Sequence, residues 1–227
     1  MNFCAIKHIV NPKRVIDIGA NIGEFASSLG NICADVKITM IEANPNCKDN
    51  LSEIGYPFII MALSNNKKQK VKFFIDKNNN ISTGASLYRE NTDFYTDCDK
   101  IEVDTHLLDD LNIYPEGVDL LKIDVQGSER DIIEGSTNTL KRTNYLLLEC
   151  SFSNYNIGAP QIEEVISSVE KFGFYPTHIL EEHWSRPGID LPLVRTVHQI
   201  DVLFSKIKNN LCEQKIVQYR KDYDNSL

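Results

Sequence analysis

The stretch VIDIGANIGEFA, residues 15–26, decides the fold. An apolar run ends in Asp17, Gly19, Asn21 and Gly23 follow, and a segment able to form a helix comes next. This order predicts a strand, a tight turn and a helix N-terminus, a common place to hold a nucleotide-like cofactor. Because glycine has no Cβ, the backbone at Gly19 and Gly23 can approach a ligand closely.

The glycines of this turn separate two classes of cofactor. A dinucleotide-binding turn has the pattern G-x-G-x-x-G. Here an acid precedes only two glycines, and Phe25 and Ala26 occupy the region where a third is expected. The pattern favours S-adenosylmethionine, whose ammonium group we expect Asp17 to meet directly or through water. An NAD-dependent oxidoreductase is the rival enzyme class.

Composition limits the partners and the compartment. The chain has 227 residues, of which 42% are hydrophobic and 25% charged, so a single domain over residues 1–227 is expected. The net charge of −8 argues against a nucleic-acid partner. No apolar run approaches the roughly 18 residues of a membrane span, and the first residues lack signal-peptide features. We therefore predict a cytoplasmic protein with no membrane partner. Its scattered cysteines are expected to be reduced, without a metal site.

The remaining elements follow from hydrophobic runs and turn residues. Mainly apolar runs without regular polar alternation are typical of strands buried on both faces of a parallel sheet, and they occur at 15–18, 36–42, 58–62, 118–125 and 145–150. Helices are predicted at 24–31, at 45–55 and after Pro160 as far as Gly173. Two late strands are predicted at 175–180 and 200–205, separated by a loop over 181–198. The fold class is thus α/β, a Rossmann-like doubly wound sheet.

Two segments depart from the strand and helix alternation. Residues 65–115 predict an insertion of small β elements after the third strand, with short strands at 70–76, 85–88 and 101–103. The polar residues 206–227 predict a C-terminal tail or helix.

Acids at the ends of predicted strands are the candidate site residues. Glu42 ends the second strand, where an acid commonly accepts hydrogen bonds from ribose hydroxyls, or else is solvated or interacts with the next helix dipole. Asp124 reaches the edge where open α/β sheets bind ligands. It is able to take a substrate proton, bind a metal or hold the cofactor. Alternatively, it marks a strand end before a helix in which Ser128 and Asp131 resemble a capping box.

Glu149 and His183 are further candidates for the catalytic base, after Asp124. Glu149 follows three leucines, so desolvation is expected to raise its pKa, and it serves either as a base or anchor or in a buried ion pair. His183 and Trp184 fall in the predicted late loop, which could cover the ligand edge. For His183, His106 and His198 a structural role is the more common one.

With these elements in place, the chain resembles the FkbM-type family of S-adenosylmethionine-dependent methyltransferases. The resemblance implies a seven-stranded doubly wound sheet whose last strand is antiparallel, and methylation of a hydroxyl on a sugar, glycan or secondary metabolite. The segments that carry it are VIDIGANIGEFA at 15–26, IEANP at 41–45, ALSN at 62–65, STGASLY at 82–88, VDTHLLDDL at 103–111, VDLLKIDVQGSERDIIEGS at 118–136, LLLEC at 146–150 and DVLF at 201–204.

The resemblance also implies site residues. The cofactor-binding set comprises Asp17, Gly19, Ala20, Asn21 and Gly23 around the methionine part, Glu42 and Asn44 at the ribose, Ala62, Leu63 and Ser64 near the adenine, and Ser86 and Asp124 facing the methyl group and acceptor.

One position departs from the family pattern. Gln126 stands where the family usually has Glu, which keeps open a non-catalytic module that binds S-adenosylmethionine or S-adenosylhomocysteine. A sugar hydroxyl is a weak nucleophile, so a general base or a divalent ion that acidifies the hydroxyl would help. The sequence contains no spacing that supports a metal site.

Overall fold

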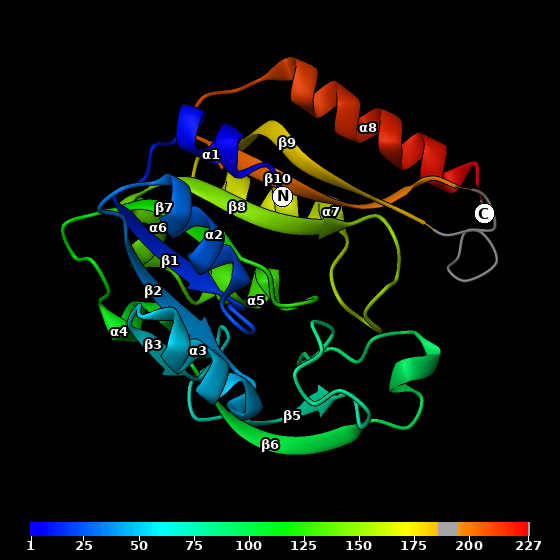
Figure 1. The fold of residues 1–227 in the computed structure, drawn as a ribbon. Helices are drawn as coiled ribbons and strands as arrows, with labels where there is room; N and C mark the ends of the chain where they lie inside the picture. Colours follow the sequence, from blue (N-terminus) through cyan, green and yellow to red (C-terminus); the bar gives the residue numbers. More distant parts are fainter. Residues whose placement is uncertain (186–194, 227) are drawn as a thin grey trace.

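The strands of the main sheet lie in the order β3-β2-β1-β7-β8-β10-β9 (Figure 1). The computed structural model describes residues 1–185 and 195–226. In this sheet β3, β2, β1, β7 and β8 are mutually parallel, and β10 is antiparallel to both of its neighbours. The predicted doubly wound sheet with an antiparallel last strand is therefore confirmed. The strand bounds are β1 Arg14–Ile18, β2 Lys37–Glu42, β3 Phe58–Ile60, β7 Val118–Ile123, β8 Thr143–Ser151, β9 Tyr175–Trp184 and β10 Val197–Ser205.

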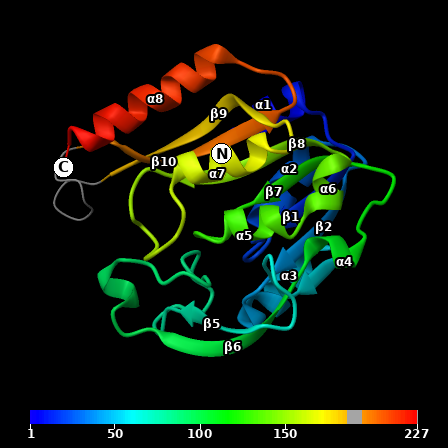
Figure 2. The same ribbon diagram turned by 180° about the vertical axis from the view of Figure 1, so that it is seen from behind.

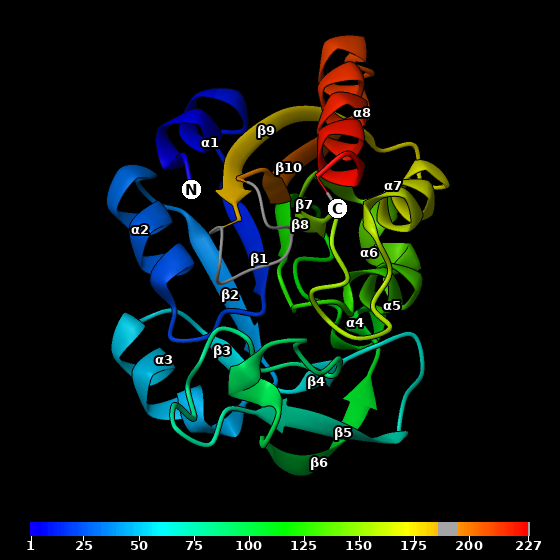
Figure 3. The ribbon, with the colours of Figure 1, turned by 90° about the vertical axis from the view of Figure 1, so that its right-hand side faces the viewer.

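Helices cover both faces of this sheet, as Figures 2 and 3 show. Successive side chains of a strand point to opposite faces, so Val15 packs with one helical layer and Ile16 with the other. In the same way Leu120 and Leu121 enter different clusters. One layer contains α1 Phe3–Ile9, α2 Glu24–Ile32 and α3 Lys48–Ile54; the other contains α4 Leu108–Leu111, α5 Glu129–Glu134, α6 Thr137–Lys141, α7 Ile162–Glu170 and α8 Asn210–Asp224.

The predicted insertion is a separate three-stranded sheet of order β4-β6-β5. Its strands are β4 Ala62–Leu63, β5 Lys70–Ile75 and β6 Asp99–His106. The single strand predicted over 58–62 is wrong, because β3 leaves the main sheet after Ile60 and β4 pairs with β6. The strand predicted over 85–88 is also wrong. Within 85–88 only Ser86 makes a bridge, to Phe74, through two backbone hydrogen bonds that no neighbouring residue extends into a ladder.

The late part of the chain contains longer strands than predicted. The loop predicted over 181–198 is wrong at both ends, because β9 continues through Trp184 and β10 begins at Val197, and these two residues pair. His183 and Trp184 therefore lie on a strand. The middle of that predicted loop, 186–194, lies outside the described residues. The polar tail forms α8. In the part of the chain that the structure describes, no helix is long and apolar enough to cross a membrane.

Two short segments near the site also differ from the predictions. The strand predicted over 118–125 ends at Ile123, which leaves Asp124 in the following turn. The capping box predicted at Ser128 is wrong, because its side chain caps nothing. Instead, the carboxylate of Glu129 accepts the backbone N–H groups of Val125 and Gly127. The turn between β7 and α5 is thus closed by a buried acid.

Candidate active site

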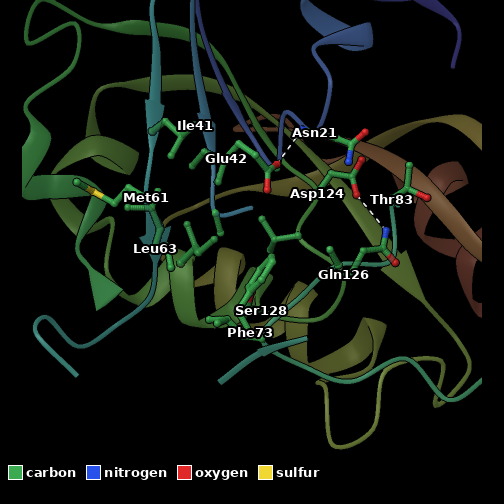
Figure 4. A pocket seen from close by; sticks show the side chains of 18 residues that line it. Asn21, Ile41, Glu42, Met61, Leu63, Phe73, Thr83, Asp124, Gln126 and Ser128 are labelled. Carbon is green, nitrogen blue, oxygen red and sulfur yellow. Dashed lines mark hydrogen bonds between the residues drawn. The ribbon is translucent and has the colours of Figure 1, made fainter. Parts of the chain in front are cut away.

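Two adjoining cavities lie at the carboxyl ends of the parallel strands. The apolar cavity is shown in Figure 4 and is lined by Ile18, Gly19, Asn21, Ile41, Glu42, Ala43, Met61, Ala62, Leu63, Phe73, Thr83, Ala85, Leu87, Asp124, Val125, Gln126, Ser128 and Ile132. The polar cavity is lined by Gly19, Asn21, Thr83, Gly84, Glu90, Asp124, Gln126, Glu149, Tyr155, His183 and Gln199. Both occupy the edge of the sheet at which α/β folds bind ligands.

Gly19 lets the ends of β1 and β7 come together. Its φ of +75° is unfavourable for other residues, and a Cβ there would lie 1.7 Å from the backbone oxygen of Asp124. The amide of Asp124 in turn donates to the carbonyl of Ile18, at 3.1 Å. The predicted need for glycine at this turn therefore has a steric cause, and the close approach places Asp124 beside Gly19 in both cavities.

Glu42 presents a buried carboxylate to the apolar cavity. Its two oxygens accept the backbone N–H groups of Asn21 and Asn44, each at 2.7 Å (the first is drawn in Figure 4). Burial raises the pKa of Glu42 above its usual value, and these hydrogen bonds offset only part of that shift. Each carboxylate oxygen can accept a second hydrogen bond. Glu42 is thus able to receive two neighbouring hydroxyl groups from a ligand.

Asp17 is paired inside the protein and lines neither cavity. Its carboxylate has no solvent exposure, and Oδ1 lies 3.2 Å from Nζ of Lys122, which also lies 3.2 Å from Oδ2 of Asp124. Burial raises the pKa of Asp17, and the ammonium of Lys122 opposes that shift. The two carboxylates hold the pKa of Lys122 above its usual value despite burial. The sequence signal for this link is a lysine inside the apolar run VDLLKIDV, which our sequence interpretation did not use.

Several residues predicted to bind the cofactor do not face either cavity, and two of them hold neighbouring loops in place through hydrogen bonds. Asn44 is buried, and its side chain accepts from the amide of Asn46 and donates to the carbonyl of Asn80, so it fixes the loop above the cavity. The hydroxyl of Ser86 donates to the carbonyls of the turn after β7. Ala62 and Leu63 do line the apolar cavity. The remaining predicted residues that line neither cavity are Ala20, Gly23 and Ser64.

The three predicted catalytic residues meet in the polar cavity. Asp124 follows β7, Glu149 lies on β8 and His183 lies on β9. Nε2 of Gln126 donates to Oε2 of Glu149 at 2.6 Å and to Oδ1 of Asp124 at 3.3 Å, the second of which is drawn in Figure 4. Burial and the nearby charges of Asp124 and Asp201 raise the pKa of Glu149 well above its usual range.

Asp201 is a site residue that sequence reasoning missed. It lies on β10 and is 5% exposed. Its Oδ2 lies 3.4 Å from Nε2 of His183, and this contact raises the pKa of His183. In the sequence, Asp201 is marked only as the acid that begins the apolar run DVLF. That it lies between β8 and β9 follows from the order of the strands in the sheet.

A wider groove continues from the polar cavity. The outer groove is lined by Asp76, Ser82, Thr83, Gly84, Glu90, Asn91, Thr92, Asp93, Phe94, Tyr95, Phe152, Ser153, Asn154, Tyr155, Gln161, His198, Arg220, Tyr223 and Asp224. It shares Thr83, Gly84, Glu90 and Tyr155 with the polar cavity. The ring of Phe94 is 66% exposed at this groove. His106, in contrast, ends β6 and lines none of these three spaces.

The chemistry of the two cavities suits a ligand with three parts. Ile41, Met61, Leu63 and Phe73 can enclose a flat apolar ring. Glu42 can accept two neighbouring hydroxyls. At Gly19 and Asn21, where the two cavities meet, there is room for a charged end, and this order of an apolar ring, a diol and a zwitterion is that of S-adenosylmethionine.

Comparisons with solved structures return methyltransferases at low sequence identity. A TehB-like SAM-dependent methyltransferase from Corynebacterium glutamicum is 10% identical, with 86% of this chain and 80% of that chain covered and a TM-score of 0.44. A precorrin-6y C5,15-methyltransferase from Geobacter metallireducens is 13% identical, covering 86% and 79%, with a TM-score of 0.44. An O-methyltransferase family protein from Burkholderia thailandensis is 9% identical, covering 91% and 55%, with a TM-score of 0.48.

The family assignment comes from a family model. No curated protein matches the chain at a significant level. The model of the methyltransferase FkbM domain matches residues 17–176, which include the turn after β1, the inserted small sheet, β7 and β8. The chain therefore belongs to the FkbM family of S-adenosylmethionine-dependent methyltransferases.

Proposed function

We propose that the protein methylates a hydroxyl group of a sugar or a sugar-bearing metabolite. The observation that carries the proposal is the position of Asp124. Five residues line both the apolar and the polar cavity: Gly19, Asn21, Thr83, Asp124 and Gln126. Of these five, only Asp124 has a carboxylate side chain, which can accept a proton. A proton acceptor therefore lies where the methyl donor and the acceptor meet.

Residues of the apolar cavity would hold the methyl donor. Met61, Leu63 and Phe73 provide the walls for the adenine, and Glu42 provides acceptors for the ribose hydroxyls. When bound, S-adenosylmethionine supplies an electrophilic methyl group, whose bond to sulfur breaks as its bond to the acceptor oxygen forms, and the sulfide leaves. The protein contributes chiefly by aligning the two reactants, because this displacement is in line.

Asp124 would receive the proton that the hydroxyl loses. Lys122 and Gln126 contact different oxygens of this carboxylate, at 3.2 and 3.3 Å, and so fix its orientation. Its side chain is 32% exposed, which leaves it accessible from the polar cavity. A carboxylate is a weak base toward a sugar hydroxyl, so a hydroxyl that is itself acidified would react faster.

The outer groove supports a sugar as the acceptor. Sugars present C–H faces that pack on aromatic rings and hydroxyls that donate to carboxylates. The groove offers Phe94 and Tyr155 for packing, and Asp76, Glu90 and Asp93 as acceptors. It opens into the polar cavity at Glu90 and Tyr155, so a bound sugar could extend one hydroxyl toward Asp124.

The test combines cofactor binding with turnover. Calorimetric titration of the protein with S-adenosylmethionine and with NAD is expected to show binding of the first alone. Release of S-adenosylhomocysteine is then measured with a panel of sugars, nucleotide sugars, phenols and amines, and the methylated atom is identified by mass spectrometry and NMR. Methylation of an amine, or cofactor binding without turnover on any acceptor, would contradict the proposal.

The Asp124→Asn variant tests the assigned base. It is expected to lose at least 100-fold in turnover, in line with the usual contribution of general base catalysis, while binding of S-adenosylmethionine stays within a few-fold. Asp104→Asn is the matched control, because Asp104 is an exposed acid on β6 away from the cavities. Full activity of Asp124→Asn would remove Asp124 from the mechanism.

A further inference from the structure

Three side chains of types that can bind metals come together at the polar cavity, where Glu149 and His183 line the wall and Asp201 lies behind them. Glu149, His183 and Asp201 come from the neighbouring strands β8, β9 and β10. One donor atom from each lies within 4.8 Å of the others. Carboxylate and imidazole ligands bind transition ions at about 2.0–2.2 Å, so two ligands of one ion lie at most about 4.4 Å apart. Small side-chain movements would bring the three donors onto a single ion.

The hydrogen bonding of these residues leaves donor atoms available. Gln126 and Gln199 both donate to the same oxygen of Glu149, Oε2, at 2.6 and 3.5 Å. No hydrogen bond from the described residues reaches its Oε1. Nε2 of His183 is buried and has no hydrogen bond of good geometry among the described residues, although Asp201 lies 3.4 Å away. Amide partners that orient a ligating carboxylate are typical of metal sites.

Among the described residues, no lysine or arginine balances the acids of this cluster. Asp124, Glu149 and Asp201 lie close enough to influence one another. The ammonium of Lys122 is paired with Asp17 and Asp124, and that of Met1 is paired with Glu181. Within residues 1–185 and 195–226, no lysine or arginine forms an ion pair with Glu149 or Asp201. Buried charges are normally paired or coordinate a metal, so a bound cation would complete this wall of the cavity.

We propose that Glu149, His183 and Asp201 bind a divalent first-row transition cation beside the methyl-transfer site. The imidazole nitrogen argues against Mg²⁺ and Ca²⁺, which take oxygen ligands, and the mixed nitrogen and oxygen set suits Mn²⁺, Fe²⁺ or Zn²⁺. With only three protein ligands, the ion keeps open positions toward the cavity, as catalytic sites do.

The role of the ion rests on the proposed function. The acceptor hydroxyl would occupy an open position on the ion, which lowers the pKa of the hydroxyl, and its proton would pass to Asp124 as the oxygen attacks the methyl carbon. No oxidation or reduction is involved. This arrangement offsets the weak basicity of a carboxylate toward a hydroxyl.

Metal binding is tested without turnover. Purified full-length protein is treated with EDTA, dialysed, and titrated with Mn²⁺ while the signal of free Mn²⁺ is followed by electron paramagnetic resonance. One site per chain is expected, and Zn²⁺ is expected to displace Mn²⁺ from it. His183→Gln and Asp201→Asn are each expected to weaken Mn²⁺ binding at least tenfold. Glu182→Gln is the matched control, since Glu182 follows the same strand but pairs with Lys215 on the other face.

Binding of S-adenosylmethionine is measured for every variant, so that loss of the metal site can be told apart from loss of the folded methyltransferase. All variants are expected to retain it, which shows that they are folded. If the wild type binds no Mn²⁺ or Zn²⁺, or if His183→Gln and Asp201→Asn bind Mn²⁺ as the wild type does, the metal site is wrong while methyl transfer stands. If the wild type binds one Mn²⁺ per chain and the ligand variants lose it, the metal site is supported. If no acceptor is then methylated, that result counts only against the methylation of a hydroxyl.

Discussion

Replacing Lys122 by methionine tests the ion pairs that Lys122 forms with Asp17 and Asp124 next to the turn after β1. Methionine fills most of the lysine volume but removes the ammonium that lies 3.2 Å from both Asp17 and Asp124. Asp124 is partly exposed and can be solvated, whereas Asp17 has no exposure. The main consequence is therefore an unpaired charge at Asp17, and breaking a buried ion pair in this way usually costs about 3–5 kcal/mol.

Protonation of Asp17 limits this loss. A carboxyl group with an ordinary pKa of about 3.9 is protonated at pH 7 at a cost of about 4 kcal/mol, from 1.36 kcal/mol per pH unit. At pH 5 the same cost is about 1.5 kcal/mol. Because the unfolded chain ionises at 3.9 while the folded Lys122→Met variant keeps Asp17 neutral, its stability relative to the wild type falls as the pH rises. Because burial already raises the pKa of Asp17 in the wild type, about 4 kcal/mol is the upper limit of the destabilisation expected at pH 7, and less than half of that is expected at pH 5.

The assay is urea unfolding at pH 5 and pH 7, followed by circular dichroism. The double variant Asp17→Asn with Lys122→Met is the control, since it lacks the titrating group and should lose the extra pH dependence. A destabilisation of Lys122→Met below about 1 kcal/mol at pH 7, or one of equal size at both pH values, would refute the reasoning that Lys122 favours the ionised form of the buried Asp17.

Three further predictions concern the cavity walls. Gly19→Ala is expected to abolish binding of S-adenosylmethionine in a calorimetric titration, because the added Cβ would meet the Asp124 carbonyl at 1.7 Å. Gly55→Ala, with a similar φ of +84° but nothing within 4 Å, should bind normally and lose about 1–2 kcal/mol of stability; equal binding by both variants would contradict the steric reason. Glu42→Gln should weaken this binding about tenfold or more, since a hydrogen bond to a charged group contributes about 1.5–3 kcal/mol, and an unchanged affinity would remove Glu42 from the ribose site. Burial raises the pKa of Glu129 to about 7, so the folded protein holds this proton more strongly than the unfolded chain does. Stability contributed by Glu129 should fall by about 3–4 kcal/mol as the pH rises from about 4.3 to 7, and Glu129→Gln should remove that slope in urea unfolding; identical slopes would contradict it.

The sequence by itself determined the fold class and the methyl donor. Strand positions follow from short apolar runs, and the turn after Asp17 favours glycine because the φ of Gly19 is +75°. These signals lie within a few residues of one another, so they can be read along the chain. For the same reason the position of Glu42 at the end of β2 could be read from the sequence, while its role at the ribose stays a prediction.

The tertiary structure alone decided which polar groups meet. Asp17 lies deeper than its position at a strand end suggested, because Lys122 on the neighbouring strand captures its carboxylate. His183 belongs to a strand rather than a loop, since its backbone pairs with β10. Asp201 joins Glu149 and His183 only because β10 inserts between β8 and β9. Such contacts depend on the order of strands far apart in the sequence, and hydrophobic periodicity carries no information about that order.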